Sequence, residues 1–371
     1  MGSTVRNEYA PDVVSPPGET LQDVLEERDL SQADLADRTG RTKKTINEIV
    51  KGKAPITPET ALQFENVLGI PAAFWNNREM AYRAYLARQA ENDRLKQDIS
   101  WIRELPYLEM ARKGWIPESR DKIERVRALL SFFAVASREQ WEEVAIRPQA
   151  SFRRSKKYES DPGALSAWLR QGEIAASQLQ CGAFNRQAFV EALEEARTLT
   201  VEPPDRFVPE LANICARSGV AVVFIPELRG LRVWGATRWL SPSRALIQLS
   251  LRYKTDDHLW FTFFHEVGHI LLHNKRDVFV ENNDSNSGEE KEADRFATNH
   301  LIPPSDFVRL RPRTLYSEAA VRDFAQQLGI APGIVVGRLQ HEGLLPFTHL
   351  NGLKRHFRWA ESQEENAKKN G

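Results

Sequence analysis

The sequence predicts a multidomain, mainly α-helical protein with an all-α N-terminal part and an α+β part towards the C-terminus. Three observations predict this. The chain has 371 residues, more than one hydrophobic core usually organises. Residues 17–199 interleave charged and apolar positions with helical spacing. Residues 220–251 then form β-branched segments bounded by proline, glycine or serine, which is typical of a small sheet.

The composition indicates a globular protein without a strong overall charge. Apolar residues make up 41% of the chain, and 51 basic residues balance 51 acidic ones. Cys181 and Cys215 form no CxxC pair, which argues against a disulfide framework and against a thiolate metal site. No secretory signal and no run of about 18 apolar residues is present, so we expect a cytoplasmic protein with no membrane partner.

Four short helices are expected between residues 17 and 75. Ser31, followed by Asp34 three residues later, has the shape of a capping box, which is a helix N-terminus signature. Each helix starts at a residue suited to that position: Pro17, Ser31, Thr42 and Thr57. We therefore expect an all-α domain over residues 17–80.

The remaining domain boundaries are placed where the pattern of apolar and polar residues changes. We expect a helical connecting domain over residues 81–205, an α+β domain over 206–310 and a C-terminal helical region over 311–360. The polar ends, residues 1–16 and 361–371, are expected to be disordered.

The α+β domain should contain three strands followed by two helices. The strands are expected at 220–226, 231–239 and 244–251, and the helices at 256–273 and 289–300. The third strand could offer an edge on which an extended peptide lies as an added strand.

The first of these two helices carries the pattern HExxH, in which His265 and His269 flank Glu266. Positions i and i+4 lie one turn apart on the same face, so both histidines can present imidazoles to one ion, with Glu266 beside it. Zinc takes this arrangement naturally, and nitrogen and oxygen ligands also admit manganese. The pattern therefore predicts a metal site.

The following helix supplies a candidate third ligand. A catalytic zinc needs three protein ligands and one open position, and Glu290 suits the third place. Asp294, four residues later, could accept the free ring N–H of a ligating histidine, whereas Glu292 points away from both. Acidic residues in a first helical turn also commonly serve the helix dipole alone. His258 and His273 lie near the same helix face as His265 and His269. We expect these two residues to pack beside the metal site or support its ligands rather than bind the metal.

This set predicts metal-assisted amide hydrolysis. A bound zinc ion would polarise the scissile carbonyl and acidify a water, while Glu266 would take the water's proton and pass it to the departing amine. The alternative is a non-catalytic, antitoxin-like repressor whose metal domain is structural or a sensor. A structural site would close the fourth position and would have no use for Glu266, so the complete set favours the enzyme.

The segment 30–56 has the layout of a helix-turn-helix, with a capped helix, a glycine-containing turn and a second helix. Residues 38–53 contain six basic residues against Glu48 alone, a local basic face in a neutral chain. The alternative is a dimerisation module with solvated lysines, but the clustered basic residues and the motif layout favour DNA binding. The candidate DNA-binding residues, which could meet base edges or phosphates, are Gln32, Lys43, Lys44, Thr45, Asn47, Lys51 and Lys53.

These stretches resemble two known families. Residues 17 to about 88, from PGETLQDVLEERDLSQADLADRTG to GKAPITPETALQFENVLGIPAAFW, resemble the XRE-type helix-turn-helix of HigA antitoxins. GVAVVFIPEL, FHEVGHILLH and EKEADRFATNHLIP are similar to the zincin-like ImmA/IrrE metallo-endopeptidases. One departure is His300-Leu301-Ile302-Pro303, where that family usually has Leu-Leu-Met-Pro, which affects at most the nearby pocket lining.

The second resemblance implies a zinc endopeptidase of gluzincin type. Its ligand pattern falls on His265, His269 and Glu290, with Glu266 as the catalytic acid/base. Family members cleave a repressor of the XRE type and relieve repression of mobile-element or DNA-damage genes, which implies DNA and a regulatory protein as partners. Here a helix-turn-helix lies in the same chain, so the substrate stays open and the chain could cut itself. A palindromic operator would imply a homodimer.

Overall fold

The computed structural model describes residues 14–147, 161–252, 254–273, 279–280, 288–310 and 316–359. The ends expected to be disordered lie outside these residues, apart from positions 14–16. The chain forms two compact units, Met1–Ile99 and Ser100–Gly371. Within the described part of the chain, no helix combines the length and apolar character needed to cross a membrane.

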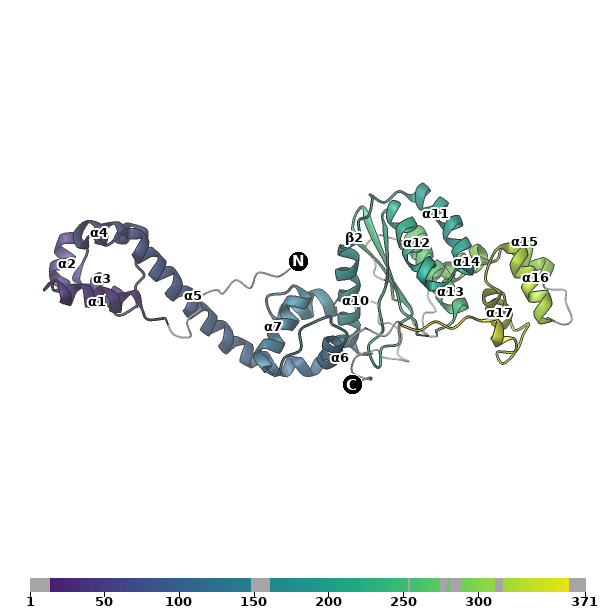
Figure 1. The fold of residues 1–371 in the computed structure, drawn as a ribbon, viewed down its shortest axis with the longest axis horizontal. Helices are drawn as coiled ribbons and strands as arrows, with labels where there is room; N and C mark the ends of the chain where they lie inside the picture. Colours follow the sequence, from purple (N-terminus) through teal and green to yellow (C-terminus); the bar gives the residue numbers. More distant parts are fainter. Residues whose placement is uncertain are drawn as a thin grey trace. The chain divides into compact units, whose positions relative to one another are not determined.

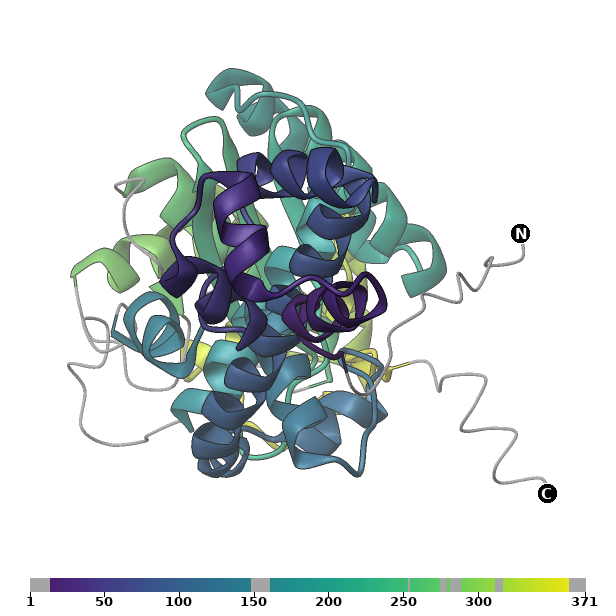
Figure 2. The ribbon, with the colours of Figure 1, turned by 90° about the vertical axis from the view of Figure 1, so that its left-hand side faces the viewer.

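The unit Met1–Ile99 is all-α, as the sequence predicts (Figure 1). Its helices share one core, in which Leu35, Phe64 and Trp75 are fully buried. Figure 2 shows the same helices, coloured from purple to blue, in a view turned by 90°. The helices are α1 (Pro17–Glu27), α2 (Gln32–Thr39), α3 (Lys43–Val50), α4 (Pro58–Leu68) and α5 (Ala72–Gln97).

Local signals set the ends of these helices. The Ser31 hydroxyl accepts a hydrogen bond from the Asp34 amide, and the Asp34 carboxylate accepts one from the Ser31 amide, which completes the expected capping box. Gly40 ends α2 with a φ of +67°, a conformation that favours glycine. Gly18 allows α1 to approach α3 closely, since a Cβ there would lie 2.2 Å from the carbonyl oxygen of Ile49.

In the described residues of the unit Ser100–Gly371, four strands form a sheet with the order β1-β3-β2-β4. β1 and β3 run parallel, whereas β2 is antiparallel to both β3 and β4. β1 and β3 are buried along nearly their whole length, which fits strands covered on both faces. The strands are β1 (Val220–Phe224), β2 (Gly235–Ser241), β3 (Arg244–Leu249) and β4 (Phe279–Val280).

Two expectations about the strands are wrong. The second strand begins at Gly235 rather than at 231, because the preceding residues form a turn in which the Leu231 amide donates to the carbonyl oxygen of Leu228 at 2.9 Å. The strand of residues 244–251 is not an edge, because β3 has hydrogen-bonded neighbours on both sides. It therefore cannot accept a peptide as an added strand.

Helices cover both faces of this sheet. α10 lies against β1 and β3 on one side, and α12 and α13 lie on the other (Figure 1). On the α10 side the Trp168 indole donates to the carbonyl oxygen of Ile225 at 3.1 Å. The helices before the sheet are α6 (Tyr107–Arg112), α7 (Lys122–Phe133), α8 (Arg138–Trp141), α10 (Pro162–Ser177), α11 (Arg186–Thr198) and α12 (Pro204–Arg217).

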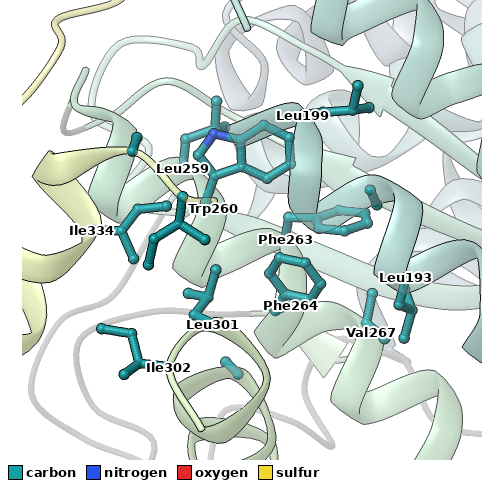
Figure 3. Packing of buried hydrophobic residues seen from close by; sticks show 14 of the residues in the cluster. Leu193, Leu199, Leu259, Trp260, Phe263, Phe264, Val267, Leu301, Ile302 and Ile334 are labelled. Carbon is teal, nitrogen blue, oxygen red and sulfur yellow. The ribbon is translucent and has the colours of Figure 1, made fainter. Parts of the chain in front are cut away.

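α13 runs through the middle of the largest hydrophobic core. Trp260, Phe263, Phe264 and Val267 on this helix are buried, and Figure 3 shows them close to side chains of the neighbouring helices. The C-terminal half of the unit contains α13 (Asp256–Leu272), α14 (Gly288–Leu301), α15 (Pro304–Leu310), α16 (Glu318–Leu328) and α17 (Pro332–His341). Short turns of other helical types are η1 (Asp98–Glu104), η2 (Glu142–Ile146), η3 (Leu199–Val201) and η4 (Asn351–Leu353).

Candidate metal centre and helix-turn-helix surface

The structure brings His265, His269 and Glu290 together, as the sequence predicts. The two Nε2 atoms of the histidines, both on α13, are 3.0 Å apart. Glu290, in the first turn of α14, places its carboxylate oxygens 3.1 Å from Nε2 of His265 and 3.7 Å from Nε2 of His269. All three residues are buried, and one ligand atom from each lies within 4.8 Å of the others.

Close packing of two helices brings Glu290 to the histidines. Gly268 lies between the two histidines in sequence and faces α14, where a Cβ would come within 2.9 Å of the Cα of Ala293. Because glycine has no side chain, the backbones of α13 and α14 approach directly at this point. Ala293 and Ala297 are fully buried on the facing side of α14.

Each histidine has a hydrogen-bonded partner on the side away from Glu290. Nδ1 of His265 lies 2.9 Å from Oδ1 of Asp294, the contact expected from the sequence. Nδ1 of His269 lies 2.9 Å from Nδ1 of His273, and Nε2 of His273 lies 3.3 Å from Oε2 of Glu292. Glu292 therefore reaches His269 through His273, although the sequence suggested that its side chain points away.

These contacts are consistent with one proton arrangement. Nδ1–H of His265 donates to Asp294, Nδ1–H of His269 donates to His273, and Nε2–H of His273 donates to Glu292. Both histidines then direct an Nε2 lone pair towards the Glu290 carboxylate. Such a group of lone pairs repels itself unless a cation lies among them, so these residues fit a divalent metal ion with nitrogen and oxygen ligands.

Burial and the two imidazoles act on the pKa of Glu290 in opposite directions. Burial would raise the pKa of the Glu290 carboxyl, but hydrogen bonds from His265 and His269, and the charges of these histidines when their Nε2 atoms carry protons, lower it to about 2. Burial lowers the pKa of His269, although the hydrogen bond to Glu290 opposes this shift. Near neutral pH Glu290 is therefore a carboxylate, and burial favours the neutral form of His269; these are the forms that bind metals.

Glu266 lies next to this group, fully buried on α13. Strand β2 fixes its position in two ways. The Thr237 hydroxyl donates to the backbone carbonyl oxygen of Glu266 at 3.2 Å. A Cβ on Gly235 would come within 2.5 Å of Oε1 of Glu266, so the absence of a side chain at 235 leaves room for the carboxylate. The spacing HExxH locates Glu266, but it gives no sign of Gly235.

The candidate DNA-binding residues lie in α2, in α3 and just after α3. The Asn47 side-chain amide donates to Oε1 of Gln32 at 3.2 Å, which links the two helices. Thr45 contacts the cap of α3, with its hydroxyl 2.9 Å from that of Thr42. The remaining candidates are exposed lysines: Lys43, Lys44, Lys51 and Lys53.

Family models match both parts of the chain. A model described as helix-turn-helix matches residues 21–75, and a model of peptidase family M78, described as the IrrE N-terminal-like domain, matches residues 218–340. The chain therefore joins a helix-turn-helix domain to an IrrE N-terminal-like domain. Both resemblances expected from the sequence are confirmed. The IrrE N-terminal-like domain contains the whole histidine and carboxylate group, and its match extends into α17.

Several solved structures are similar to part of the chain. The Pseudomonas aeruginosa antitoxin HigA, solved with the higBA promoter, is 29% identical; the match covers 23% of this chain and 95% of that chain, with a TM-score of 0.22. A second structure from this species, solved in complex with operator DNA, is 32% identical and matches over 21% of this chain and 85% of its own, with a TM-score of 0.21. A HigA-family antidote protein from Coxiella burnetii is 24% identical over 23% and 94% of the two chains, with a TM-score of 0.21. Comparison with curated proteins finds no match.

Proposed function

We propose that this protein is a DNA-binding regulator with a metal-dependent endopeptidase domain that cuts a repressor-type regulatory protein. The observation that carries the proposal is the convergence of His265, His269 and Glu290 beside Glu266, within a domain that matches a peptidase family. We propose His265, His269 and Glu290 as the ligands of a zinc ion, with manganese as the other candidate metal. The free cysteines fit a reducing cytoplasm.

In the proposed amide hydrolysis, some residues of the chain transfer protons and others orient the metal ligands. A bound zinc ion would supply Lewis acidity to the water and to the scissile carbonyl. Glu266 takes the proton from the attacking water and delivers it to the departing amine. Asp294 and the His273–Glu292 pair hold the two imidazoles in the tautomers required of ligands.

The experiment that tests the peptidase compares the wild-type chain with Glu266→Gln. Both are co-expressed with the regulatory proteins encoded by neighbouring genes, at rest and under genotoxic stress, and cleavage products are identified by mass spectrometry. We expect Glu266→Gln to keep its zinc and to lose cleavage. Glu289→Gln, an exposed neighbour of Glu290, is the matched control and should cleave normally.

Absence of any product that depends on Glu266, from a neighbour or from the chain itself, would favour the alternative function of a non-catalytic repressor. Equal cleavage by Glu266→Gln would exclude the proposed role of this carboxylate.

DNA binding is proposed to use the exposed lysines of the helix-turn-helix domain, chiefly Lys43, Lys44 and Lys51. A gel-shift assay with genomic fragments should show binding that weakens steeply with salt, because phosphate contacts release counterions. Lys43→Ala with Lys44→Ala should reduce binding, whereas Lys96→Ala, in an ion pair with Asp93 on α5, should not. A two-fold symmetric footprint would support a homodimer.

A further inference from the structure

A cavity of about 450 Å³ opens beside His265 and Glu290, within the unit Ser100–Gly371. This volume lies in the range of pockets that enclose a small ligand or a side chain. α17 contributes lining residues three or four positions apart, so one face of this helix borders the cavity. The residues on that face are Ile334, Gly337, Arg338 and His341.

Arg338 brings a positive charge to this face of α17. Its side chain is 17% exposed, and its guanidinium carbon lies 4.6 Å from the centre of the Phe307 ring. Nη2 lies 2.9 Å from Oε1 of Glu342. Nε and Nη1 are buried and have no hydrogen-bond partner among the described residues. Because unpaired buried donors of a charged group destabilise a folded protein, an acceptor for these two atoms would be favourable.

Glu342 neutralises Arg338 only in part. The two residues are four positions apart, and the Glu342 side chain is 36% exposed, so water weakens their attraction. Burial lowers the pKa of the Arg338 guanidinium, and the charge of Glu342 opposes this shift without cancelling it. The guanidinium still stays protonated near neutral pH. Arg338 is therefore a cation that its surroundings stabilise incompletely.

Lys354 is the other lining residue, among those described, that keeps a positive charge near neutral pH. It already has two partners. Its Nζ lies 2.6 Å from Oδ2 of Asp257, which is also buried, and 2.8 Å from Oε1 of Gln340. A further anion in the cavity would therefore find its partner at Arg338 rather than at Lys354.

The other carboxylates in the wall belong to the candidate metal group. Glu290 lies 3.1 Å from Nε2 of His265, and Asp294 lies 2.9 Å from Nδ1 of the same residue. A bound divalent cation would offset these two negative charges. They would then not repel an anion that enters beside α17.

We infer that Arg338 binds a carboxylate group of a ligand that enters this cavity. The carboxylate oxygens would supply acceptors for the unpaired N–H groups, and guanidinium and carboxylate match in geometry. Neighbouring side chains cover Nε and Nη1, so the guanidinium would rotate slightly to direct these donors at the ligand. A carboxylate carries one negative charge, which suits a single, partly neutralised guanidinium better than the two charges of a phosphate.

The carboxylate has three possible sources of the same chemistry. It could belong to an acidic side chain within a peptide, to the C-terminus of a peptide, or to a free organic acid. The two peptide sources rest on the proposed endopeptidase function, because the metal group would then hold the peptide beside α17. The site at Arg338 itself does not require cleavage.

Glu342 allows a test that adds affinity instead of removing it. Glu342→Gln removes the carboxylate that competes for Arg338, and the residue is exposed, so the fold should persist. We expect binding of the acid to tighten about two- to fivefold, the range of a partly exposed ion pair. Glu318→Gln breaks the similar pair with Arg322 on α16 and should change nothing.

Arg338→Gln should abolish the preference for the acid, at a loss of at least about tenfold in affinity, because it removes a charged donor. Arg322→Gln, at an exposed position on α16, is the matched control and should bind the acid as the unaltered protein does.

Binding is measured by calorimetry on the full-length, zinc-loaded Glu266→Gln protein, which separates it from cleavage. Three acids are each compared with a neutral partner. Acetyl-Ala-Ala-Glu-Ala-Ala-amide is compared with its Gln counterpart, acetyl-pentaalanine acid with its amide, and succinate with succinamide. Inorganic phosphate is titrated as a further anion. We expect at least one acid to bind at least about tenfold more tightly than its partner, and the pair that differs identifies the source of the carboxylate.

Equal affinities within all three pairs, a preference that Arg338→Gln leaves unchanged, no gain from Glu342→Gln, or tighter binding of phosphate than of every acid would overturn the inference. Glu342→Gln keeps the test decisive if Arg338→Gln does not fold. A preference that depends on Arg338, without cleavage by the wild-type protein, would refute only the endopeptidase. Cleavage by the wild type with no such preference would refute only the carboxylate site.

Discussion

Gly268 of α13 lies against Ala293 of α14, so close that a Cβ at position 268 would come within 2.9 Å of the Cα of Ala293. The contact falls between the two histidines on one helix and three residues after Glu290 on the other. The side chains of His265, His269 and Glu290 are buried between these elements. The distance between the two helix backbones therefore decides whether the Glu290 carboxylate reaches the imidazoles.

A larger residue at this contact should separate the two helices. We expect Gly268→Leu to lose most of its zinc, because overpacking forces backbones apart at a cost of about 1–3 kcal/mol and moves Glu290 away from the histidines. Metal content is measured by mass spectrometry on protein purified with zinc. Leu272→Ala, at an exposed position on the same helix, should retain zinc. Full zinc content in a folded Gly268→Leu protein would contradict the role of this contact.

Two of the exposed carboxylates of α14, those of Asp294 and Glu292, should differ in their effect on metal affinity. Asp294 contacts His265 directly, whereas Glu292 acts through His273. Asp294→Ala should therefore weaken zinc binding by about 10–100-fold, and Glu292→Ala by less. Competition with a chromogenic chelator gives both affinities. Glu289→Ala serves as the control, and an equal, small effect of all three substitutions would show that these contacts do not support the imidazoles.

The sequence predicts that the candidate metal ligands lie together, because the signals for this are local. His265 and His269 are one turn apart on a helix whose buried face is evident from its apolar residues, and Glu290 and Asp294 share a face of the next helix. The link from His269 through His273 to Glu292 is missed because nothing in the spacing shows that two residues 19 positions apart meet.

The arrangement of the strands also depends on contacts between distant segments, which the sequence does not predict. The segments rich in β-branched residues locate β1 and β3, but their place in the sheet depends on pairing between distant segments. β3 pairs with β1 on one side and with β2 on the other, so the strand expected at an edge lies in the interior. The start of β2 is set by a turn at Leu231 that the alternation of residue types does not predict.

The capping box of α2 should lower the pKa of Asp34. Hydrogen bonds from the Ser31 hydroxyl and amide lower the pKa of Asp34 below its ordinary 3.8. A lowered pKa in the folded protein stabilises it above the unfolded pKa, and this contribution disappears as the pH falls through the folded pKa. Side-chain NMR should find the Asp34 pKa below 3.8, and Ser31→Ala should raise it. An unchanged pKa in Ser31→Ala would contradict the capping box.

The two cysteines should react differently with alkylating reagents. Cys215 is fully buried, and burial, together with the nearby Cys181 thiol, raises its pKa, so it forms almost no thiolate in the folded protein. Cys181 is partly exposed. Iodoacetamide at pH 8 should label one thiol per chain, and both after unfolding. Mass spectrometry identifies the site, Cys181→Ser should remove the labelling of the folded chain, and labelling of Cys215 in the folded protein would contradict its burial.

Substitution of Gly235 should slow the chemical step without changing the metal content. A methyl group at this position would come within 2.5 Å of the carboxylate of Glu266, so Gly235→Ala should displace the proposed proton carrier while leaving His265, His269 and Glu290 in place. With a peptide that the wild type cleaves, we expect kcat to fall by about 100-fold with zinc content unchanged, since a positioned general base is typically worth that much or more. Ser241→Ala, at the exposed end of β2, should cleave normally.

Combining this substitution with Glu266→Gln shows whether Gly235 acts through that carboxylate. The double variant should cleave no more slowly than Glu266→Gln alone, because removing the carboxylate leaves nothing for the added methyl group to displace. Additive losses would instead mean that Gly235→Ala disturbs the sheet or the peptide path. Normal kcat in the single variant would show that Glu266 can retreat from the methyl group and still transfer its proton, and that β2 does not fix its working position.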